Sequence, residues 1–377
     1  MVELIYRPEY ASYDFGRDHP FSPIRLEMVL DLLHDLGVHV EPTACPKAER
    51  EDILSVHSPE YVACVEALGR GESVEDAERY GLGTPDNPIF PGMADAAAWL
   101  VGGTLGAARR AAEGEPRNVL HLGGGLHHAQ WSNASGFCLF NDLAVAIRAL
   151  TESGLYVSYL DIDVHHGDGV QALFYEDDHV QTISFHESGQ YLFPGTGGIH
   201  ELGQGMGRGL KINVPLEPFT EEESYLDAFD RVVPRALGHF KPGLLVVQAG
   251  ADAHYEDPLA DLMLTTRTYE ALYRRIIKLA REHAGGRILW TLGGGYSLLA
   301  SPRVWTLLVL TLMEQPLPES LPAVWVERWS ERLRKSLPGT LHDANPAFDP
   351  IPRREEISRR NKTVVRRLLD SLSRYWL

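Results

Sequence analysis

The chain has 377 residues, of which 44% are hydrophobic and 23% are charged, so it can bury a large core. Its net charge of −17 disfavours nucleic acid and anionic membranes as main partners. Three cysteines without a Cys-x-x-Cys pair indicate neither a disulfide framework nor a thiolate zinc site, and the first residues show no secretory signal. We therefore expect a cytoplasmic protein.

Strand-like and helix-like segments alternate along the chain. Apolar, β-branched runs predict strands, and periodic apolar positions predict helices between several of them. This alternation indicates an α/β fold, a single large domain with a mainly parallel sheet covered by helices on both faces. The predicted strands are 118–124, 156–164, 180–185, 244–250 and 287–295, and the predicted helices are 94–113, 142–153, 221–240 and 266–283.

Polar, glycine-rich segments follow each of these strands. In chain order they read GGGLHHA, DVHHGDG, HESGQYLFPGTG, GADAHYEDP and GGGYS. In open α/β sheets ligands bind at the carboxyl ends of the strands. We therefore expect the five segments to converge on one rim and to form an active site there.

The last sixty residues differ in character from the rest. We expect residues 1–315 to form the catalytic domain and residues 316–377 to form a helical appendage. In that appendage Val364, Leu368, Leu372 and Trp376 recur every four residues, which predicts an apolar helix face packed on the body or on a partner subunit of a homo-oligomer. The tail is also basic, with nucleic-acid binding as the less favoured interpretation.

Two carboxylates and one imidazole are candidates for a metal site. Asp161, Asp163 and His165 lie on one face of an extended segment, because side chains alternate along a strand. Alone, they could equally cap a strand-to-helix loop. Asp252, at another strand end, would add a second carboxylate and leave a position for water, as catalytic Zn, Fe or Co centres do.

Other rim residues could handle protons. His127 and His128 follow a glycine run and suit an acid and base pair, although loop histidines are often structural. Tyr296 could donate to an oxyanion or could simply fill the core. The chain has no phosphate-binding glycine motif and no Gly-x-Ser-x-Gly elbow, so metal-activated water is favoured over nucleotide binding or a nucleophilic serine.

Taken together, these motifs resemble the histone deacetylase superfamily, and within it the bacterial acetoin-utilisation-type deacetylases. The motifs that carry the resemblance are HPFSPIRL, GGGLHHA, GFCLFND, DIDVHHGDGVQ, SFHESGQYLFPGTG, GADAHYEDPL and LGGGYS, in the family's order from His19 to Ser297. The resemblance implies an arginase/deacetylase-like fold. It also implies catalytic Zn²⁺, with Fe²⁺ as an alternative.

The resemblance assigns a role to each candidate. It implies that the metal ligands are Asp163, His165 and Asp252, that His128 is the general base and acid, that His127 assists electrostatically, that Tyr296 holds the substrate carbonyl, and that Asp161 and Asp168 support the two histidines. The implied substrate-binding residues are Asp86, Gly136, Phe137, Phe193, Leu259 and Gly294. A structural K⁺ is expected at Asp161, Asp163, His165, Ser184 and Phe185.

The implied reaction is hydrolysis of N-acetyl-lysine, in a protein or peptide, to lysine and acetate. One alternative is an acetylpolyamine amidohydrolase acting on a small acetylated amine, but Leu259 stands where an acidic gatekeeper is expected in such enzymes. A second is an arginase-type ureohydrolase with two Mn²⁺ ions, which would need an Asp-x-Asp pair at Asp252. A non-catalytic reader of acetyl-lysine is disfavoured, because every expected catalytic residue is present.

Overall fold

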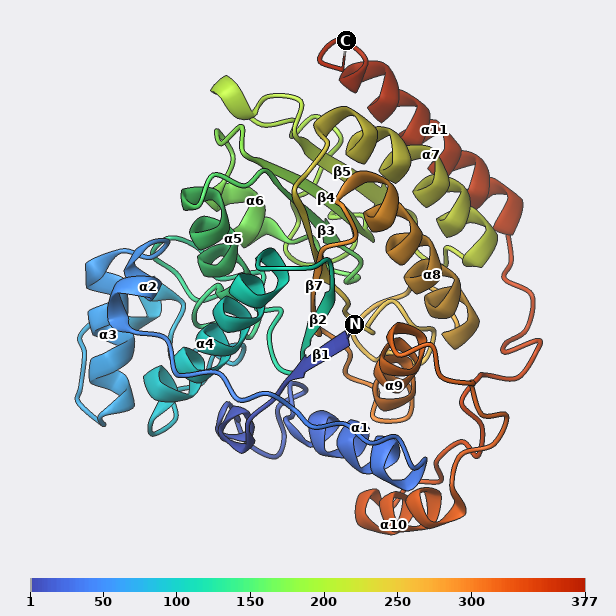
Figure 1. Ribbon diagram of the computed structural model, residues 1–377, viewed down its shortest axis with the longest axis horizontal. Helices are drawn as coiled ribbons and strands as arrows, with labels where there is room; N and C mark the ends of the chain where they lie inside the picture. The colour runs from blue at the N-terminus through green and yellow to red at the C-terminus, as the bar shows by residue number, and fades with distance from the viewer. Residues whose placement is uncertain (1, 377) are drawn as a thin grey trace.

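The computed structural model describes residues 2–376, and within them seven parallel strands form one sheet (Figure 1). The strand order is β1-β2-β7-β6-β3-β4-β5, and every neighbouring pair is parallel. The strands are β1 (Val2–Ile5), β2 (Asn118–His121), β3 (Val157–Asp161), β4 (Val180–Glu187), β5 (Lys211–Leu216), β6 (Leu244–Gln248) and β7 (Ile288–Thr291).

All five predicted strands are confirmed, whereas β1 and β5 were not predicted. These two strands are the edges of the sheet. Strand β5 carries Lys211, Asn213 and Pro215, so it lacks the apolar run that marks the central strands. Proline is tolerated at an edge strand because its missing N–H costs little hydrogen bonding there.

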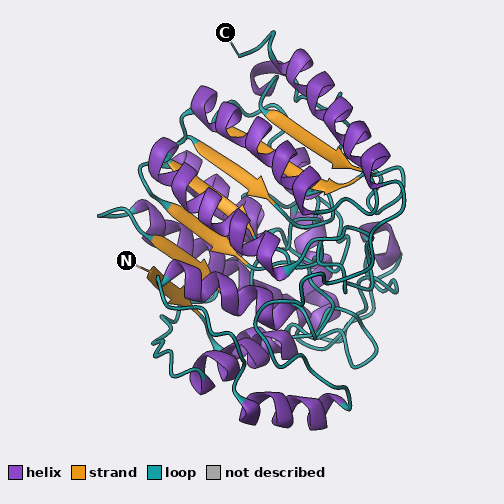
Figure 2. Ribbon diagram, turned by 90° about the vertical axis from the view of Figure 1, so that its right-hand side faces the viewer, coloured by secondary structure: helices purple, strands orange, loops and turns teal. Residues whose placement is uncertain are grey.

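Helices cover both faces of the sheet, and the four predicted helices are confirmed (Figures 1 and 2). One face carries α4 (Met93–Ala112), α5 (Asp142–Glu152) and α6 (Asp168–Leu173), with α2 (Arg50–Leu54) and α3 (Pro59–Gly69) further out. The other face carries α1 (Ile24–Asp35), α7 (Glu222–Phe240), α8 (Thr266–His283) and α9 (Ser301–Leu312). Short 3₁₀ turns are η1 (Pro8–Ser12), η2 (Ala77–Tyr80) and η3 (Gly205–Gly207).

Alternating strand side chains build a hydrophobic layer on each face. Tyr159 and Val246 are buried against the α4 and α5 side, whereas Leu160 and Val247 are buried against the α7 and α8 side. Burying an aliphatic side chain of this size stabilises a fold by about 1.5–3 kcal/mol. The sheet is therefore packed against helices on both faces, and this packing supports the loops at its carboxyl edge.

The C-terminal segment packs on the body. Helix α10 (Ala323–Leu333) lies against α1, and helix α11 (Arg354–Leu372) runs beside α7 and β5 (Figure 1). The buried apolar stripe of α11 consists of Val365, Leu368 and Leu372, so the predicted stripe is wrong at Val364, which is only partly buried. Trp376 lies beyond the end of the helix and packs, partly buried, against the core. These side chains belong to the same hydrophobic cluster as α7 and α8. A domain boundary at residue 315 remains a prediction.

Membrane insertion by a helix has no support in the described part of the chain. None of its helices combines the length and the apolar character needed to cross a bilayer.

Candidate active site

Side chains from several strand ends meet at the carboxyl edge of the sheet. Asp163 and His165 follow β3, Asp252 follows β6, and Tyr296 follows β7. His127 and its neighbour His128 lie in the loop between β2 and α5. Strands β3 and β6 are parallel neighbours, and Asp161 pairs with Gln248 at the end of both strands. The segment with Asp163 and His165 and the segment with Asp252 therefore leave the sheet side by side.

Asp163, His165 and Asp252 form a compact, buried group. Each offers one ligand atom, and these atoms lie within 4.8 Å of one another. Nδ1 of His165 is 3.2 Å from Oδ1 of Asp163 and 3.1 Å from Oδ2 of Asp252. Two oxygens and one nitrogen, with the ring edge facing both carboxylates, are the ligand set of an open catalytic zinc or iron site.

The charges of this group favour a bound cation. Burial raises the pKa of Asp252 to about 8, and the charge of Asp163 adds to the rise. Burial alone would lower the pKa of His165, but the two carboxylates outweigh it and raise that pKa to about 10. Adjacent buried carboxylates repel each other unless a cation lies between them. Without a metal ion, Asp252 and His165 hold protons at this point, and a divalent metal ion that displaces them fits the donor set.

Backbone and amide donors hold the ligands in place. Asp163 Oδ2 accepts from the backbone N–H of Gly294 at 2.9 Å and from the side-chain amide of Gln248 at 2.6 Å. Asp252 Oδ1 accepts from the backbone N–H of Val164 at 2.9 Å. Partners of this kind orient metal ligands. Predicted as a substrate-binding residue, Gly294 thus contacts a candidate metal ligand directly.

The two histidines form a hydrogen-bonded chain with two aspartates. His127 Nδ1 is 2.8 Å from Asp161 Oδ2, and His128 Nδ1 is 2.6 Å from Asp168 Oδ1. The Nε2 atoms of the two rings are 3.0 Å apart. Gln130 donates to the second oxygen of Asp168 at 2.8 Å, which fixes that carboxylate. The predicted pairing of each histidine with its aspartate is present in the structure.

The histidines differ in their protonation. Burial lowers the pKa of His127, but Asp161 and Asp163 outweigh this effect and raise it to about 9. Burial and the neighbouring His127 lower the pKa of His128 to about 4, despite the hydrogen bond to Asp168. The two environments therefore favour the protonated form of His127 and the neutral form of His128, which suits the first to an electrostatic role and the second to the role of a base.

Tyr296 keeps its proton beside the metal ligands. Burial, reinforced by the charges of Asp252 and Asp163, raises the pKa of Tyr296 well above its ordinary value. Its backbone N–H donates to Asp257 Oδ2 at 2.7 Å. The guanidinium of Arg25 donates to the carbonyls of residues 293 and 295 at 3.1 and 2.7 Å. Both contacts fix the loop that carries the phenol.

Two aromatic rings flank this centre. The ring of Phe193 lies 5.0 Å from the ring of His128, and the ring of Phe137 lies 5.6 Å from that of Tyr296. Gly136 has a φ of +51°, and a Cβ on it would lie 2.4 Å from Cδ2 of His128, so only glycine fits there. The side chain of Phe193 is 43% exposed, which places it at the mouth of the site.

The remaining predicted residues lie at the mouth or along the strands. Asp86 is exposed, and its carbonyl is 3.2 Å from Nε2 of His19, whose ring packs on Phe137. Leu259 is partly exposed, and its N–H donates to Asp257 at 3.0 Å. Ser184 pairs with Asp161 across β3 and β4, and Phe185 follows it. A structural K⁺ bound at these strand residues remains a prediction.

Sequence reasoning assigned no role to three supporting residues within the quoted motifs. They are Arg25 in HPFSPIRL, Asp142 in GFCLFND and Asp257 in GADAHYEDPL. Asp142 accepts from the backbone N–H groups of Gly125 and Leu126 at 3.0 and 2.7 Å, and so shapes the loop before the histidine pair. The signal available in the sequence was a charged residue inside each motif that had been given no role.

A sequence model of the histone deacetylase domain matches residues 19–312, which is well over half of the chain. The chain belongs to the histone deacetylase family. Acetoin utilization protein AcuC of Bacillus subtilis (strain 168) is 40% identical over 371 residues, covering 97% of this chain and 96% of the relative.

Solved structures agree with this assignment. The crystal structure of an HDAC homologue from Aquifex aeolicus has a TM-score of 0.84 at 27% identity and covers 97% of this chain and 99% of its own. An HDAC homologue complexed with SAHA has a TM-score of 0.86 at 27% identity, with the same coverage. This histone deacetylase-family chain is therefore a hydrolase of the deacetylase class with an arginase/deacetylase fold.

Proposed function

We propose that the chain hydrolyses the acetyl amide of N-acetyl-lysine in a protein or peptide, with Zn²⁺ or Fe²⁺ at Asp163, His165 and Asp252. The observation that carries the proposal is the buried three-ligand group next to His128, whose ring Asp168 holds at 2.6 Å. When bound, the metal ion supplies Lewis-acid polarisation of the carbonyl and a water of lowered pKa.

Three side chains have separate roles in proton transfer and charge stabilisation. His128 is held by Asp168 and takes a proton on Nε2 from the attacking water, then returns it to the leaving lysine amine. His127 is held by Asp161 and stabilises the negative charge that develops beside it. Tyr296 donates its phenolic O–H to the carbonyl oxygen as that oxygen becomes an oxyanion.

The mouth of the site supports a long, slender substrate. Phe137 and Phe193 offer apolar walls for the methylene stem of an acetyl-lysine, and Asp86 offers an exposed carboxylate for backbone N–H groups of the substrate. Leu259 offers no charge to a second amine, which argues against acetylpolyamines. The second candidate, an arginase-type ureohydrolase, needs an Asp-x-Asp pair. In this chain the residue two positions after Asp252 is His254, which bonds Asp343.

The test is hydrolysis of an acetyl-lysine peptide by protein stripped of metal and then reloaded with Zn²⁺, Fe²⁺ or Mn²⁺. We expect activity to be lost on stripping and to return with Zn²⁺ or Fe²⁺. Acetylputrescine is the comparison substrate and should be hydrolysed poorly. Absence of peptide hydrolysis with all three metals would contradict the proposal.

A further inference from the structure

Asp343 is a buried carboxylate in the C-terminal segment, beyond the residues matched by the family model. It lies between α10 and α11 and collects donors from three separate elements. Its Oδ2 accepts from His254 Nε2 at 2.9 Å and from the N–H and O–H of Thr266 at 2.8 and 2.9 Å. Its Oδ1 accepts from Arg303 Nη1 at 2.8 Å. One side chain thus joins three elements of the fold.

Each of these elements leads into the candidate active site. His254 comes two residues after Asp252, in the loop that follows β6. Thr266 is the first residue of α8, which begins where that same loop ends. Arg303 lies in the first turn of α9, directly after the loop that carries Tyr296.

Backbone hydrogen bonds close a turn in the loop after β6. His254 N–H donates to the carbonyl of Ala251 at 3.3 Å, and its own carbonyl accepts from Asp257 N–H at 2.8 Å. Asp257 in turn accepts from the backbone N–H of Tyr296. The imidazole of His254 therefore anchors a turn between Asp252, a candidate metal ligand, and Asp257, which holds the backbone of Tyr296.

The same cluster contains the three oxygen and nitrogen donors of a second potential metal group, His254, Glu256 and Asp343. However, the guanidinium of Arg303 already bonds Asp343 and lies 3.3 Å from Glu256. The nitrogen Nδ1 of His254 accepts from the N–H of Glu256 at 3.2 Å, so its proton lies on Nε2 and points at Asp343. The cation of this cluster is thus the arginine, and the cluster is a structural brace.

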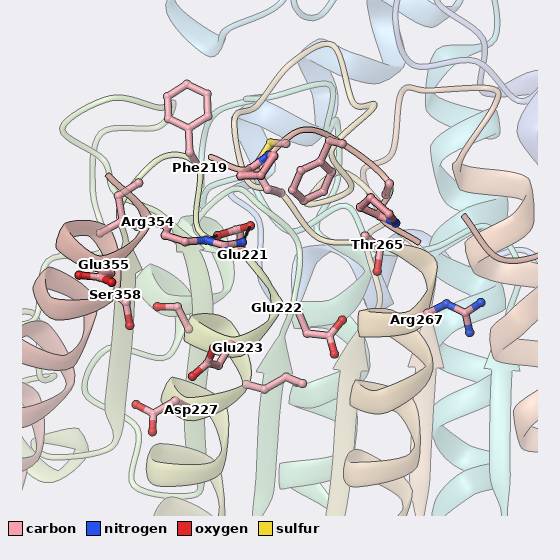
Figure 3. Close-up of a pocket in the computed structure, with 18 of the residues that line it drawn as sticks. Phe219, Glu221, Glu222, Glu223, Asp227, Thr265, Arg267, Arg354, Glu355 and Ser358 are labelled. Atoms are coloured by element: carbon pink, nitrogen blue, oxygen red, sulfur yellow. Dashed lines mark hydrogen bonds and ion pairs between the residues drawn. The ribbon is translucent and has the colours of Figure 1, made fainter. Parts of the chain in front are cut away.

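The chain continues from Asp343 into the wall of an open cavity. Residues 344–348 line this cavity of about 1230 Å³ together with Thr265 and Arg267 at the start of α8 and Arg354 at the start of α11 (Figure 3). Asp343 is therefore the point at which the C-terminal segment turns inward from the surface. An exposed acid six residues later, Asp349, has no such contacts and provides a matched control.

We propose that Asp343 is a positioning residue, through which the C-terminal segment holds the Asp252 loop in the geometry needed to bind metal. This inference rests on the proposed metal centre. It makes residues beyond 315 part of the catalytic unit, although none of the described ones forms a hydrogen bond with Asp163, His165 or Asp252. Removal of the charge leaves at least one buried donor of His254, Thr266 or Arg303 without an acceptor, and the loop then relaxes.

The experiment compares Co²⁺ binding by the full-length wild type with binding by Asp343→Asn, His254→Leu and Asp349→Asn. The visible d–d absorption of the bound ion reports both the affinity and the geometry of the site. We expect Asp343→Asn and His254→Leu to weaken Co²⁺ binding by about 10-fold or more and to alter the absorption bands. Asp349→Asn should behave as the wild type. With the variants saturated in metal, kcat for the acetyl-lysine peptide should fall while KM stays unchanged.

Wild-type affinity and spectrum in folded Asp343→Asn would overturn the inference. If that variant does not fold, His254→Leu decides by the same criterion, because it leaves the contacts of Asp343 with Thr266 and Arg303 in place. A wild type that binds Co²⁺ but hydrolyses no acetyl-lysine would contradict the proposed function alone. A wild type that binds no Co²⁺ would overturn both the metal centre and the role of Asp343.

Discussion

Replacing Gly294 by alanine should disable the metal centre without altering any ligand. A Cβ at this position would lie 1.9 Å from Oδ2 of Asp252 and 2.8 Å from Oδ2 of Asp163. The backbone of Gly294 does not lie in the left-handed region, so alanine can adopt its conformation. The effect of the substitution therefore comes from contact with the two carboxylates.

The size of the effect follows from these distances. Real Cβ atoms essentially never approach a neighbour closer than 3.0 Å, so the Asp252 carboxylate has to move. That displacement is roughly 1 Å, and a misplacement of about 1 Å can cost about 100-fold in rate. We therefore expect Gly294→Ala to lower kcat/KM by about 100-fold, equivalent to about 2.7 kcal/mol of transition-state stabilisation.

The assay measures bound metal by elemental analysis and kcat/KM with an acetyl-lysine peptide. Gly238→Ala is the control, because Gly238 lies in the last turn of α7 and a Cβ there meets only Cε1 of His283 at 3.7 Å. This control should keep full activity and gain up to about 1 kcal/mol in stability, the helix-propensity difference between glycine and alanine. Full metal content and wild-type kcat/KM in Gly294→Ala would refute the reasoning.

Three further predictions follow from single contacts. Tyr296→Phe removes the oxyanion donor and should lower kcat by about 100- to 1000-fold with an unchanged circular dichroism spectrum, and near-normal turnover would exclude the phenol from the reaction. Asp163→Ala should lose both metal and activity, and retention of either, measured by elemental analysis and turnover, would contradict the ligand assignment. Burial alone would raise the pKa of Asp343, but His254 and Arg303 hold it well below its usual value. Its stabilisation is therefore present above about pH 4 and lost as the pH falls further, so urea titrations should show a steeper acid loss of stability in the wild type than in Asp343→Asn. Equal slopes would argue against that pKa depression.

The central layers of the fold were predictable because their signals are local. Strand β6 begins with four consecutive apolar residues, β3 is rich in apolar residues and buried throughout, and α8 has an apolar stripe bounded by Thr265 and His283. The two edge strands were not predictable, since the short β1 includes the charged Glu3 and β5 includes Lys211, Asn213 and Pro215. Their pairing depends on the neighbouring strand and not on their own pattern.

The position of the candidate site was predictable because polar residues follow a predicted strand. Asp161 is the last residue of β3, whereas Asp163 and His165 lie in the loop beyond it, so the strand period indicates where they lie but does not set their direction. The brace around Asp343 could not be predicted, because it joins residues 89 and 40 positions apart along the chain, counted to His254 and to Arg303. No local pattern encodes a contact between a C-terminal loop and the loop after β6.

The central claim is that Asp163, His165 and Asp252 bind one metal ion. Anomalous diffraction at the zinc absorption edge, from crystals of zinc-loaded protein, tests it most directly. The account predicts one strong peak per chain, bonded to all three side chains and within reach of the Tyr296 hydroxyl. Two adjacent peaks, or one peak that leaves Asp252 unbound, would contradict it.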